Sequence, residues 1–424
     1  MFLLFFLIGI ATAETFAVTG CAGYIGSHMT LKLLEQGHRV VGMDNLSRGS
    51  VELLHVLQTF PLFTFYKLDL GNTRAINVVF QTHPDITTIF HFAAVAFPAE
   101  SVQYPELYRQ NITDNTRNVV DMMLLHSIKT LVYSSTCAVY GAPTTFPITE
   151  NTETDTISPY GKYKLEAERY IQTKTGPSFR AHILRYFNVV GAEITGRLGE
   201  IPRDTLTKYG RIWTSVVDTI YEKRECVSIY ETTLATPDGT AVRDYIHVSD
   251  LVDAHIAVLQ VEDSHVWNVA NGNAVSVFDF IDAAQRACKH KIPVCIENKS
   301  IGFSPPYLRA SSQKLTTMTG WTPKHTSIQF MLATSWKSIT YRMRKKSQQM
   351  YKNVTNRLKE MKKVCASENL PIWVQFAHRW KSEADRYIDI ITGTRSGNSV
   401  RATLELKSLY ESLNFLNYNS SVRR

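Results

Sequence analysis

The most constraining feature of the sequence is a regular alternation of short apolar runs with longer amphipathic segments over roughly its first 190 residues. The short runs predict strands, and the segments between them have the periodicity of helices. Strands that alternate with helices form βαβ units, which predicts an α/β fold with a doubly wound parallel sheet. The expected strands are 15–19, 39–44, 63–69, 88–92, 130–134 and 181–186, and the expected helices are 24–36, 73–82, 105–125 and 160–174.

The chain is 424 residues long, which is more than one domain core usually holds. We assign residues 14–190 to the domain that contains the alternating strands and helices. Residues 191–340, where the alternation loosens, are expected to form a smaller C-terminal substrate-binding lobe, partly interleaved with the sheet. Residues 341–424 form an appended extension, predicted to be helical because apolar side chains recur there at helical spacing.

The net charge of +8 originates in this extension. Residues 341–424 carry 17 Lys and Arg against 7 Asp and Glu, which leaves a net charge of −2 for the first 340 residues. A nearly neutral main region suits a protein that handles small molecules and argues against nucleic acid as a partner. The extension is either a solvated helical surface or a weak contact site for an acidic membrane surface or protein.

Residues 1–13 are an apolar run, MFLLFFLIGIATA, that is too short to span a membrane. The run ends in the small-x-small pattern of a signal-peptidase site, although it lacks the usual basic start. We interpret it as a signal or hydrophobic anchor, which favours the secretory pathway or Golgi lumen over the cytoplasm. The alternatives are an extension packed on the fold or a misplaced start codon. Six cysteines in a chain this long do not indicate a disulfide scaffold, and no His/Cys cluster has the spacing of a metal site.

A glycine-rich loop with Gly20, Gly23 and Gly26 follows the first strand and opens the first helix. Such a loop lets the backbone approach a pyrophosphate, and the helix N-terminus offers free N–H groups to it. Asp44 ends the second strand, where a carboxylate binds the adenosine ribose hydroxyls and repels a 2′-phosphate. The pattern predicts a Rossmann-like domain that binds NAD. The nearby Arg48 leaves NADP as an alternative.

Tyr160 and Lys164 stand four residues apart at the start of a predicted helix, so they share one helix face. A tyrosine, with a pKa of about 10, is a poor base at neutral pH. A nearby ammonium and a positively charged nicotinamide ring would favour its phenolate form. Thr136 follows the end of the fifth strand. We therefore predict Tyr160 as the acid–base residue and Lys164 as the group that lowers its pKa.

Several longer stretches accompany these motifs. They are VTGCAGYIGSH (18–28), DNLSRG (44–49), HFAA (91–94), SSTCAVYG (134–141), PYGK (159–162), RYFN (185–188) and DGTAVRDYIH (238–247). In them the chain from Thr15 to about Trp336 resembles the extended short-chain dehydrogenases/reductases, and among these the UDP-glucose 4-epimerases. The stretches GRLGE (196–200) and YGRI (209–212) are similar to the UDP-arabinose (UDP-xylose) 4-epimerase branch in particular.

The resemblance implies NAD-dependent, reversible epimerisation at C4 of a UDP-sugar, of either the glucose/galactose or the xylose/arabinose pair. Tyr160 would remove the O4 proton while bound NAD+ accepts the C4 hydride, which later returns to the other face of the flat 4-keto sugar. Thr136 would hydrogen-bond O4 and the tyrosine, and Lys164 would bind the nicotinamide ribose. Dehydratases and decarboxylases of the same fold carry an acidic residue after the threonine. Cys137 and Ala138 stand there instead, which disfavours those alternatives.

The resemblance also implies further site residues. The cofactor-binding residues are Gly20, Gly23, Tyr24, Ile25, Gly26, Asp44, Asn45, Asp69, Leu70, Phe92, Ala93, Asn111, Tyr160, Lys164 and Tyr186. The substrate-binding residues are Thr136, Asn188 and Arg243.

One departure from the family concerns an Arg-x-Gly-Asp segment that grips the diphosphate. Its arginine and aspartate are missing from residues 298–307, and Lys299 is expected to substitute for the arginine. A catalytically weakened UDP-sugar-binding homologue is therefore a further alternative. The resemblance implies a homodimer formed through helices 105–125 and 160–174.

Overall fold

The computed structural model of the chain describes residues 13–202, 211–297, 299, 305–367, 371–392 and 398–422. Three parts of the sequence predictions lie outside the described residues: the apolar run before Ala13, residues 209 and 210 of the YGRI stretch, and residues 298 and 300–304 of the segment that lacks the family's arginine and aspartate. The chain forms two compact units, one of residues 1–219 and 224–335 and the other of residues 220–223 and 336–424. The sequence placed the start of the C-terminal extension at Tyr341, close to the Trp336 at which the second unit takes over the chain.

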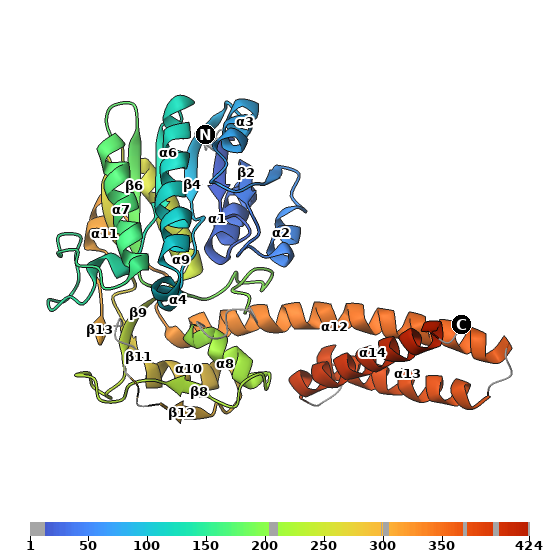
Figure 1. The fold of residues 1–424 in the computed structure, drawn as a ribbon. Helices are drawn as coiled ribbons and strands as arrows, with labels where there is room; N and C mark the ends of the chain where they lie inside the picture. Colours follow the sequence, from blue (N-terminus) through green and yellow to red (C-terminus); the bar gives the residue numbers. More distant parts are fainter. Residues whose placement is uncertain are drawn as a thin grey trace, which may run out of the picture. The chain divides into compact units, whose positions relative to one another are not determined.

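A seven-stranded parallel sheet in the order β10-β6-β5-β4-β1-β2-β3 forms the centre of the first unit (Figure 1). The predicted Rossmann-like fold class is thereby confirmed. The strand order reverses beside β1, and open α/β sheets bind ligands at such a point. The strands are β1 (Thr15–Thr19), β2 (Arg39–Asp44), β3 (Phe63–Lys67), β4 (Ile86–His91), β5 (Thr130–Ser134), β6 (Arg180–Tyr186) and β10 (His265–Val269).

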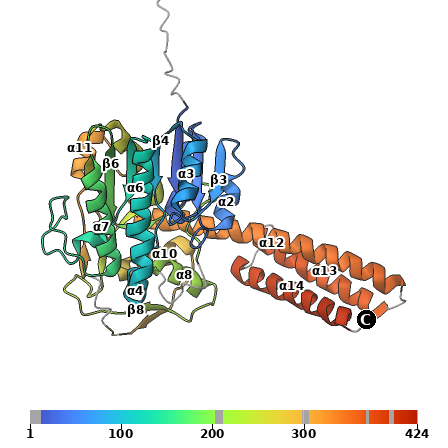
Figure 2. The ribbon, with the colours of Figure 1, turned by 45° about the horizontal axis from the view of Figure 1, so that its top comes forward.

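Helices cover both faces of the sheet, as the two separate clusters of core side chains show. Ile76, Val119 and Ile171 belong to one cluster, formed with α3, α6 and α7. Met29 and Leu251 belong to the other, formed with α1, α2 and α9. These helices are α1 (Tyr24–Glu35), α2 (Val51–Leu57), α3 (Thr73–Thr82), α6 (Asn115–Leu125), α7 (Pro159–Lys174) and α9 (Val248–Ala257). Figure 2 shows α2, α3, α6 and α7 from a second direction.

The predicted helix 105–125 is interrupted. It consists of α5 (Pro105–Tyr108), a π-helical turn (Arg109–Asp114) and α6, and the short α4 (Pro98–Gln103) precedes it. π-Helical turns inside helices are frequent at functional sites. This one carries Asn111, whose Oδ1 accepts a hydrogen bond from the Val95 N–H at 2.7 Å.

Smaller sheets build the lobe that follows β6. β9 (Val242–His247) pairs with β7 (Asn188–Val190), β11 (Ala274–Ser276) and β13 (Tyr307–Leu308). β8 (Val227–Ile229) pairs with β12 (Val294–Ile296), and a disulfide between Cys226 and Cys295 joins these two strands. The remaining helices of this region are α8 (Ile212–Ile220), α10 (Val277–Cys288) and α11 (Gln313–Thr319).

The second unit consists mainly of three long helices, as predicted for the extension. They are α12 (Ile328–Ser367), which begins in the first unit, α13 (Pro371–Thr392) and α14 (Ser399–Val422). Val354, Leu358, Ala384 and Leu406 form part of a core of its own. Among the described helices, none combines the length and the apolar character needed to cross a membrane.

Candidate functional site

A cavity of about 700 Å³ opens at the carboxyl ends of the sheet strands in the first unit. Most of the predicted site residues line it, and only Asp69 and Lys299 do not. Those that line it are Gly20, Gly23, Tyr24, Ile25, Gly26, Asp44, Asn45, Leu70, Phe92, Ala93, Asn111, Thr136, Tyr160, Lys164, Tyr186, Asn188 and Arg243. The fold thus gathers residues from positions 20 to 243 into one site.

The glycine-rich loop has the shape of a pyrophosphate cradle. A Cβ on Gly20, whose φ is +71°, would lie 2.7 Å from the Ala93 nitrogen, and a Cβ on Gly26 would lie 2.1 Å from the Gly20 oxygen. Gly23 caps α1 without a side-chain hydrogen bond, and the first turn of α1 carries no acidic residue. The first N–H groups of α1 therefore have neither a capping side chain nor a carboxylate competing for them, which suits a bound phosphate.

The carboxylate of Asp44 is held at the end of β2. Only 8% of Asp44 is exposed, and its oxygens accept hydrogen bonds from the N–H groups of Ala22 (3.0 Å) and Leu46 (2.7 Å). Asn45, next in the chain, donates a hydrogen bond to Asp69 at 2.7 Å. Asp69 therefore acts on this end of the site by positioning Asn45, although it does not line the cavity itself.

Helix α7, which carries Tyr160 and Lys164, begins at Pro159, and the side chain of Ser158 caps it by accepting a hydrogen bond from the Gly161 N–H at 3.2 Å. Tyr160 and Lys164 are 8% and 3% exposed. The Nζ atom of Lys164 donates to the Ser134 carbonyl oxygen at 2.7 Å, so its position is set by the end of β5.

A buried ion pair fixes α7 on the sheet. Glu168, one turn after Lys164, pairs with Arg185 of β6 at 2.6 Å, and their side chains are 1% and 7% exposed. Ser135 donates a further hydrogen bond to the same carboxylate. Charge-assisted hydrogen bonds of this kind restrict the orientation of a helix more than apolar contact does.

The pKa of Tyr160 differs from the sequence-based expectation. Burial raises the pKa of Tyr160 to about 12, opposed by a hydrogen bond with Thr136 and by the charge of Arg211. Burial also lowers the pKa of Lys164 to about 7, opposed by Glu168. The expected lowering of the Tyr160 pKa by Lys164 is therefore absent, because the same burial that isolates the tyrosine also disfavours the ammonium.

Lys299 does not occupy the place expected for it. Its side chain is 76% exposed, lies 3.8 Å from Glu297 and does not line the cavity. A lysine so far in solvent is a poor replacement for a buried diphosphate ligand. Arg243 does line the cavity, with its Nη1 donating to the Val242 carbonyl oxygen at 2.8 Å.

Besides Arg48 and Arg243, Arg211 and Arg224 line the cavity, and neither of these two was predicted as a site residue. Arg211 pairs with Glu200 at 2.5 Å and lies over the ring of Phe97, 5.4 Å from its centroid. Arg224 donates a hydrogen bond to Ser215 at 3.1 Å. Glu200 belongs to the GRLGE stretch and Arg211 to the YGRI stretch, so these motifs could have identified both residues as part of the site. Nothing in the sequence pattern pointed to Arg224.

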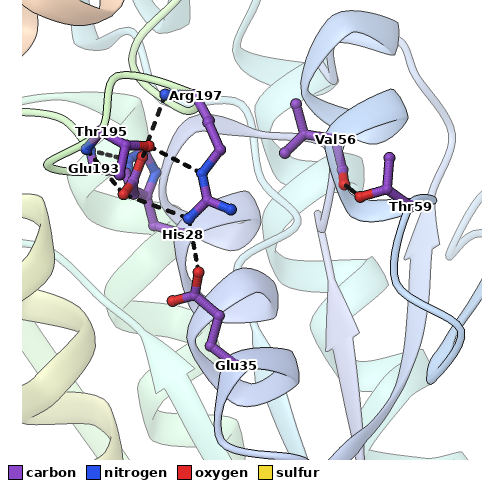
Figure 3. Close-up of polar contacts among 7 residues, drawn as sticks. All are labelled: His28, Glu35, Val56, Thr59, Glu193, Thr195 and Arg197. Atoms are coloured by element: carbon purple, nitrogen blue, oxygen red, sulfur yellow. Dashed lines mark hydrogen bonds and ion pairs between the residues drawn. The ribbon is translucent and has the colours of Figure 1, made fainter.

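The loop after β7, which leads to Glu200, is fastened to α1 (Figure 3). Arg197 pairs with Glu35 of α1 at 2.7 Å, and the Glu193 N–H donates to His28 Nε2 at 3.1 Å. The hydroxyl of Tyr24 donates to the Gly191 carbonyl oxygen at 2.5 Å. These contacts hold the loop beside the helix whose N-terminus forms the phosphate cradle.

Metal chemistry has no evident site here. Within the part of the chain that the structure describes, no group of three or more His, Cys, Asp or Glu side chains is arranged to hold a metal ion. The Cys137 thiol lines the cavity, but burial raises its pKa to about 12, so it stays neutral and weakly nucleophilic.

Comparison with known proteins gives consistent matches. Residues 16–270 match the NAD dependent epimerase/dehydratase family. UDP-arabinose 4-epimerase 1 of Arabidopsis thaliana is 43% identical over 329 residues, which are 76% of this chain and 78% of that protein. A UDP-glucose 4-epimerase of Halalkalibacterium halodurans is 37% identical over 326 residues, 75% of this chain and 93% of that protein.

Solved structures match about three quarters of the chain. The UDP-glucose 4-epimerase of Bifidobacterium longum in complex with NAD+ and UDP has a TM-score of 0.70 and 32% identity, and the match covers 77% of this chain and 98% of that one. The enzyme of Stenotrophomonas maltophila, with bound NAD and formylated UDP-arabinopyranose, has a TM-score of 0.73 and 28% identity, with 78% and 99% coverage.

Proposed function

The chain belongs to the NAD dependent epimerase/dehydratase family, and we propose that it is a UDP-sugar 4-epimerase that uses NAD. One observation carries the proposal: a glycine-rich pyrophosphate cradle and the buried Tyr160, Lys164 and Thr136 share a single cavity with Arg243. The identity to UDP-arabinose and UDP-glucose 4-epimerases supports the same reaction.

NAD+ fits the residues present. When bound, it would supply a positively charged nicotinamide ring that accepts the hydride from C4 of the sugar. Tyr160 holds and moves the O4 proton, with Thr136 positioned to hydrogen-bond the same oxygen. Because burial raises the pKa of Tyr160 to about 12, its phenolate requires positive charge nearby, and Arg211 contributes part of it. Lys164, anchored on the Ser134 carbonyl oxygen, is placed to bind a ribose hydroxyl.

Elimination or decarboxylation would need a second acid–base residue beside Thr136. Cys137 does not serve, because its pKa of about 12 keeps it protonated, and Ala138 has no titratable group. Return of the hydride to the same carbon is then the simplest outcome, which favours epimerisation.

UDP-xylose and UDP-arabinose are the first substrates to test, supported by the 43% identity to a UDP-arabinose 4-epimerase and by the stretch 196–200. The experiment incubates the purified protein with each of UDP-glucose, UDP-galactose, UDP-xylose and UDP-arabinose and separates the products by chromatography. Interconversion of one pair, absent in Tyr160→Phe, is expected. No interconversion of any pair by the wild-type protein would overturn the proposal.

We further propose that the protein works in the lumen of the secretory pathway. The Cys226–Cys295 disulfide supports this, because such bonds persist in oxidising compartments and are rare in the cytosol. Protease protection of a tagged protein in sealed vesicles, with the bond mapped by mass spectrometry without reductant, tests the proposal. A protease-accessible protein with both thiols free would contradict it.

We also propose a homodimer formed through the face that carries the helices of residues 105–125 and 160–174, which α4 precedes in the chain. Val102, Leu107 and Leu125 are 54%, 43% and 66% exposed, and burial in an interface would remove these apolar side chains from water. Light scattering after gel filtration tests this. Leu107→Glu should lower the mass to that of a monomer, whereas Val78→Glu, on α3, should not.

For the C-terminal extension we propose a weak contact with an anionic membrane or protein surface. Lys345, Lys352 and Lys359 are exposed on α12 at a spacing of seven residues, which places them on one face of the helix. Salt-sensitive sedimentation with phosphatidylserine vesicles, lost in a triple Lys→Gln variant, is the expected result.

A further inference from the structure

An ion pair joins two segments at the rim of the cavity. Arg48 lies in the loop between β2 and α2, and its Nη2 pairs with Oε1 of Glu100 on α4 at 2.7 Å. Arg48 lines the cavity, and so do Phe97 and Pro98 at the start of α4. The loop follows β2 and the helix follows β4, and these strands lie on either side of β1, so the pair bridges the end of β1, where the glycine-rich loop begins.

The loop that carries Arg48 adjoins the predicted ribose site. A Cβ on Gly49 would lie 2.5 Å from the Asp44 carboxylate, so the chain packs closely against that group immediately after Arg48. The guanidinium of Arg48 pairs with Glu100 on α4. Its charge is thus already balanced, which argues against Arg48 as a receptor for the 2′-phosphate of NADP.

Glu100 is a fixed partner. Its side chain is 7% exposed, and its second oxygen accepts a hydrogen bond from the Tyr108 hydroxyl at 2.8 Å. The neighbouring Ser101 accepts a hydrogen bond from the Tyr160 N–H at 3.1 Å, which ties α4 to the start of the catalytic helix. Arg48, which is 28% exposed, is the more accessible member of the pair. Opening of the rim would therefore move Arg48 and leave a buried carboxylate without its cation, which is costly.

We propose that Arg48 and Glu100 form a clasp across the cofactor groove that retains NAD through the reaction. This inference rests on the proposed function. A C4 epimerase has a particular need for such a clasp, because the dinucleotide that accepts the hydride must stay to return it. Loss of the reduced cofactor would strand a 4-keto sugar and stop the enzyme. Arg48 and Glu100 are thus positioning residues for the cofactor and take no part in the proton transfer.

The test measures cofactor release directly. Protein loaded with NAD+ is mixed with excess alcohol dehydrogenase and ethanol, which reduce only free NAD+, and the rate of NADH appearance reports the release rate. Arg48→Ala and Glu100→Gln should each release NAD about ten-fold faster than the wild type, in line with the coupling energies of residues in direct contact. Arg286→Ala, which removes an exposed ion pair with Asp282 on α10 outside the cavity, is the matched control and should not change the rate.

A double-mutant cycle separates the clasp from a general structural role. If the pair is the clasp, the double variant should release NAD no faster than either single variant. Tyr108→Phe, which removes the other partner of Glu100, should have a smaller effect. Arg48→Ala decides the question if Glu100→Gln fails to fold.

Two results would overturn the clasp: release at the wild-type rate from Arg48→Ala, or additive effects in the double variant. Failure of the wild-type protein to bind NAD at all would instead contradict the proposed function, and the clasp with it.

Discussion

The two ends of the cavity are built in different ways. The cofactor end comes from consecutive βα units, and its main contacts are backbone groups of the Gly20–Gly26 loop and the carboxylate of Asp44. The end proposed to bind the UDP-sugar takes Arg211, Arg224 and Arg243 from the lobe, and all three line the cavity. The cofactor end therefore depends on local backbone geometry, and the sugar end depends on side-chain charge delivered by the tertiary fold.

The prediction with the largest expected effect asks whether the acid–base residue can be removed without a loss of cofactor binding. Tyr160→Phe should lower kcat by about 10³-fold, because loss of a positioned acid–base group typically costs 10² to 10⁴. NAD content, measured after acid release, should change little, because the phosphate loop is untouched. Retention of more than about a tenth of the wild-type kcat would show that another group moves the O4 proton.

The second prediction concerns the charges of the sugar end. Arg243→Ala should raise KM for the UDP-sugar by roughly 100-fold, since removal of a charged partner costs about 2–3 kcal/mol. Arg211→Ala should weaken binding less and also lower kcat, because Arg211 stabilises the Tyr160 phenolate. Steady-state kinetics separate the two effects. Lys299→Ala is the control, and an increase in KM for that variant would restore Lys299 as a diphosphate ligand.

The third prediction concerns the buried amine of Lys164. Its folded pKa of about 7 lies below its ordinary value of 10.5, so between these values the unfolded chain binds more protons than the folded one. The free energy of unfolding should therefore rise with pH across this window, by at most about 1.4 kcal/mol per pH unit from this group. Urea unfolding of the wild type and Lys164→Met at several pH values isolates the contribution. Equal slopes for the two proteins would show that the amine stays charged when buried.

The smallest effect on catalysis is expected from deletion of the C-terminal extension. Unlike the two ends of the cavity, the part of the extension that the structure describes contains none of the residues that line it. Deletion of residues 341–424 should change kcat/KM by less than about two-fold, because the residues that line the cavity belong to the first unit and the deleted helices have a core of their own. Loss of soluble activity would show that the catalytic fold depends on the extension.

Much of the sheet could be predicted from the sequence. The bounds of β1, β2 and β5 agree with the expected strands, because buried parallel strands are short apolar runs between clear helical segments. β10 was not among the expected strands. It follows a long excursion through the lobe and joins the sheet beside β6, and no local periodicity records that pairing. The π-helical turn at Arg109–Asp114 was also missed, because its residues have ordinary helical periodicity.

The same division holds for the site. The sequence by itself determined the cofactor end and the Tyr160–Lys164 face, because these depend on spacings of a few residues within one loop or one helix turn. Only the tertiary structure decided that Lys299 stays in solvent, that Arg211 faces the cavity and that Arg48 pairs with Glu100 across it. The physical reason is that a charge acts on whatever the fold brings within a few ångströms of it, and that distance is unrelated to separation along the chain.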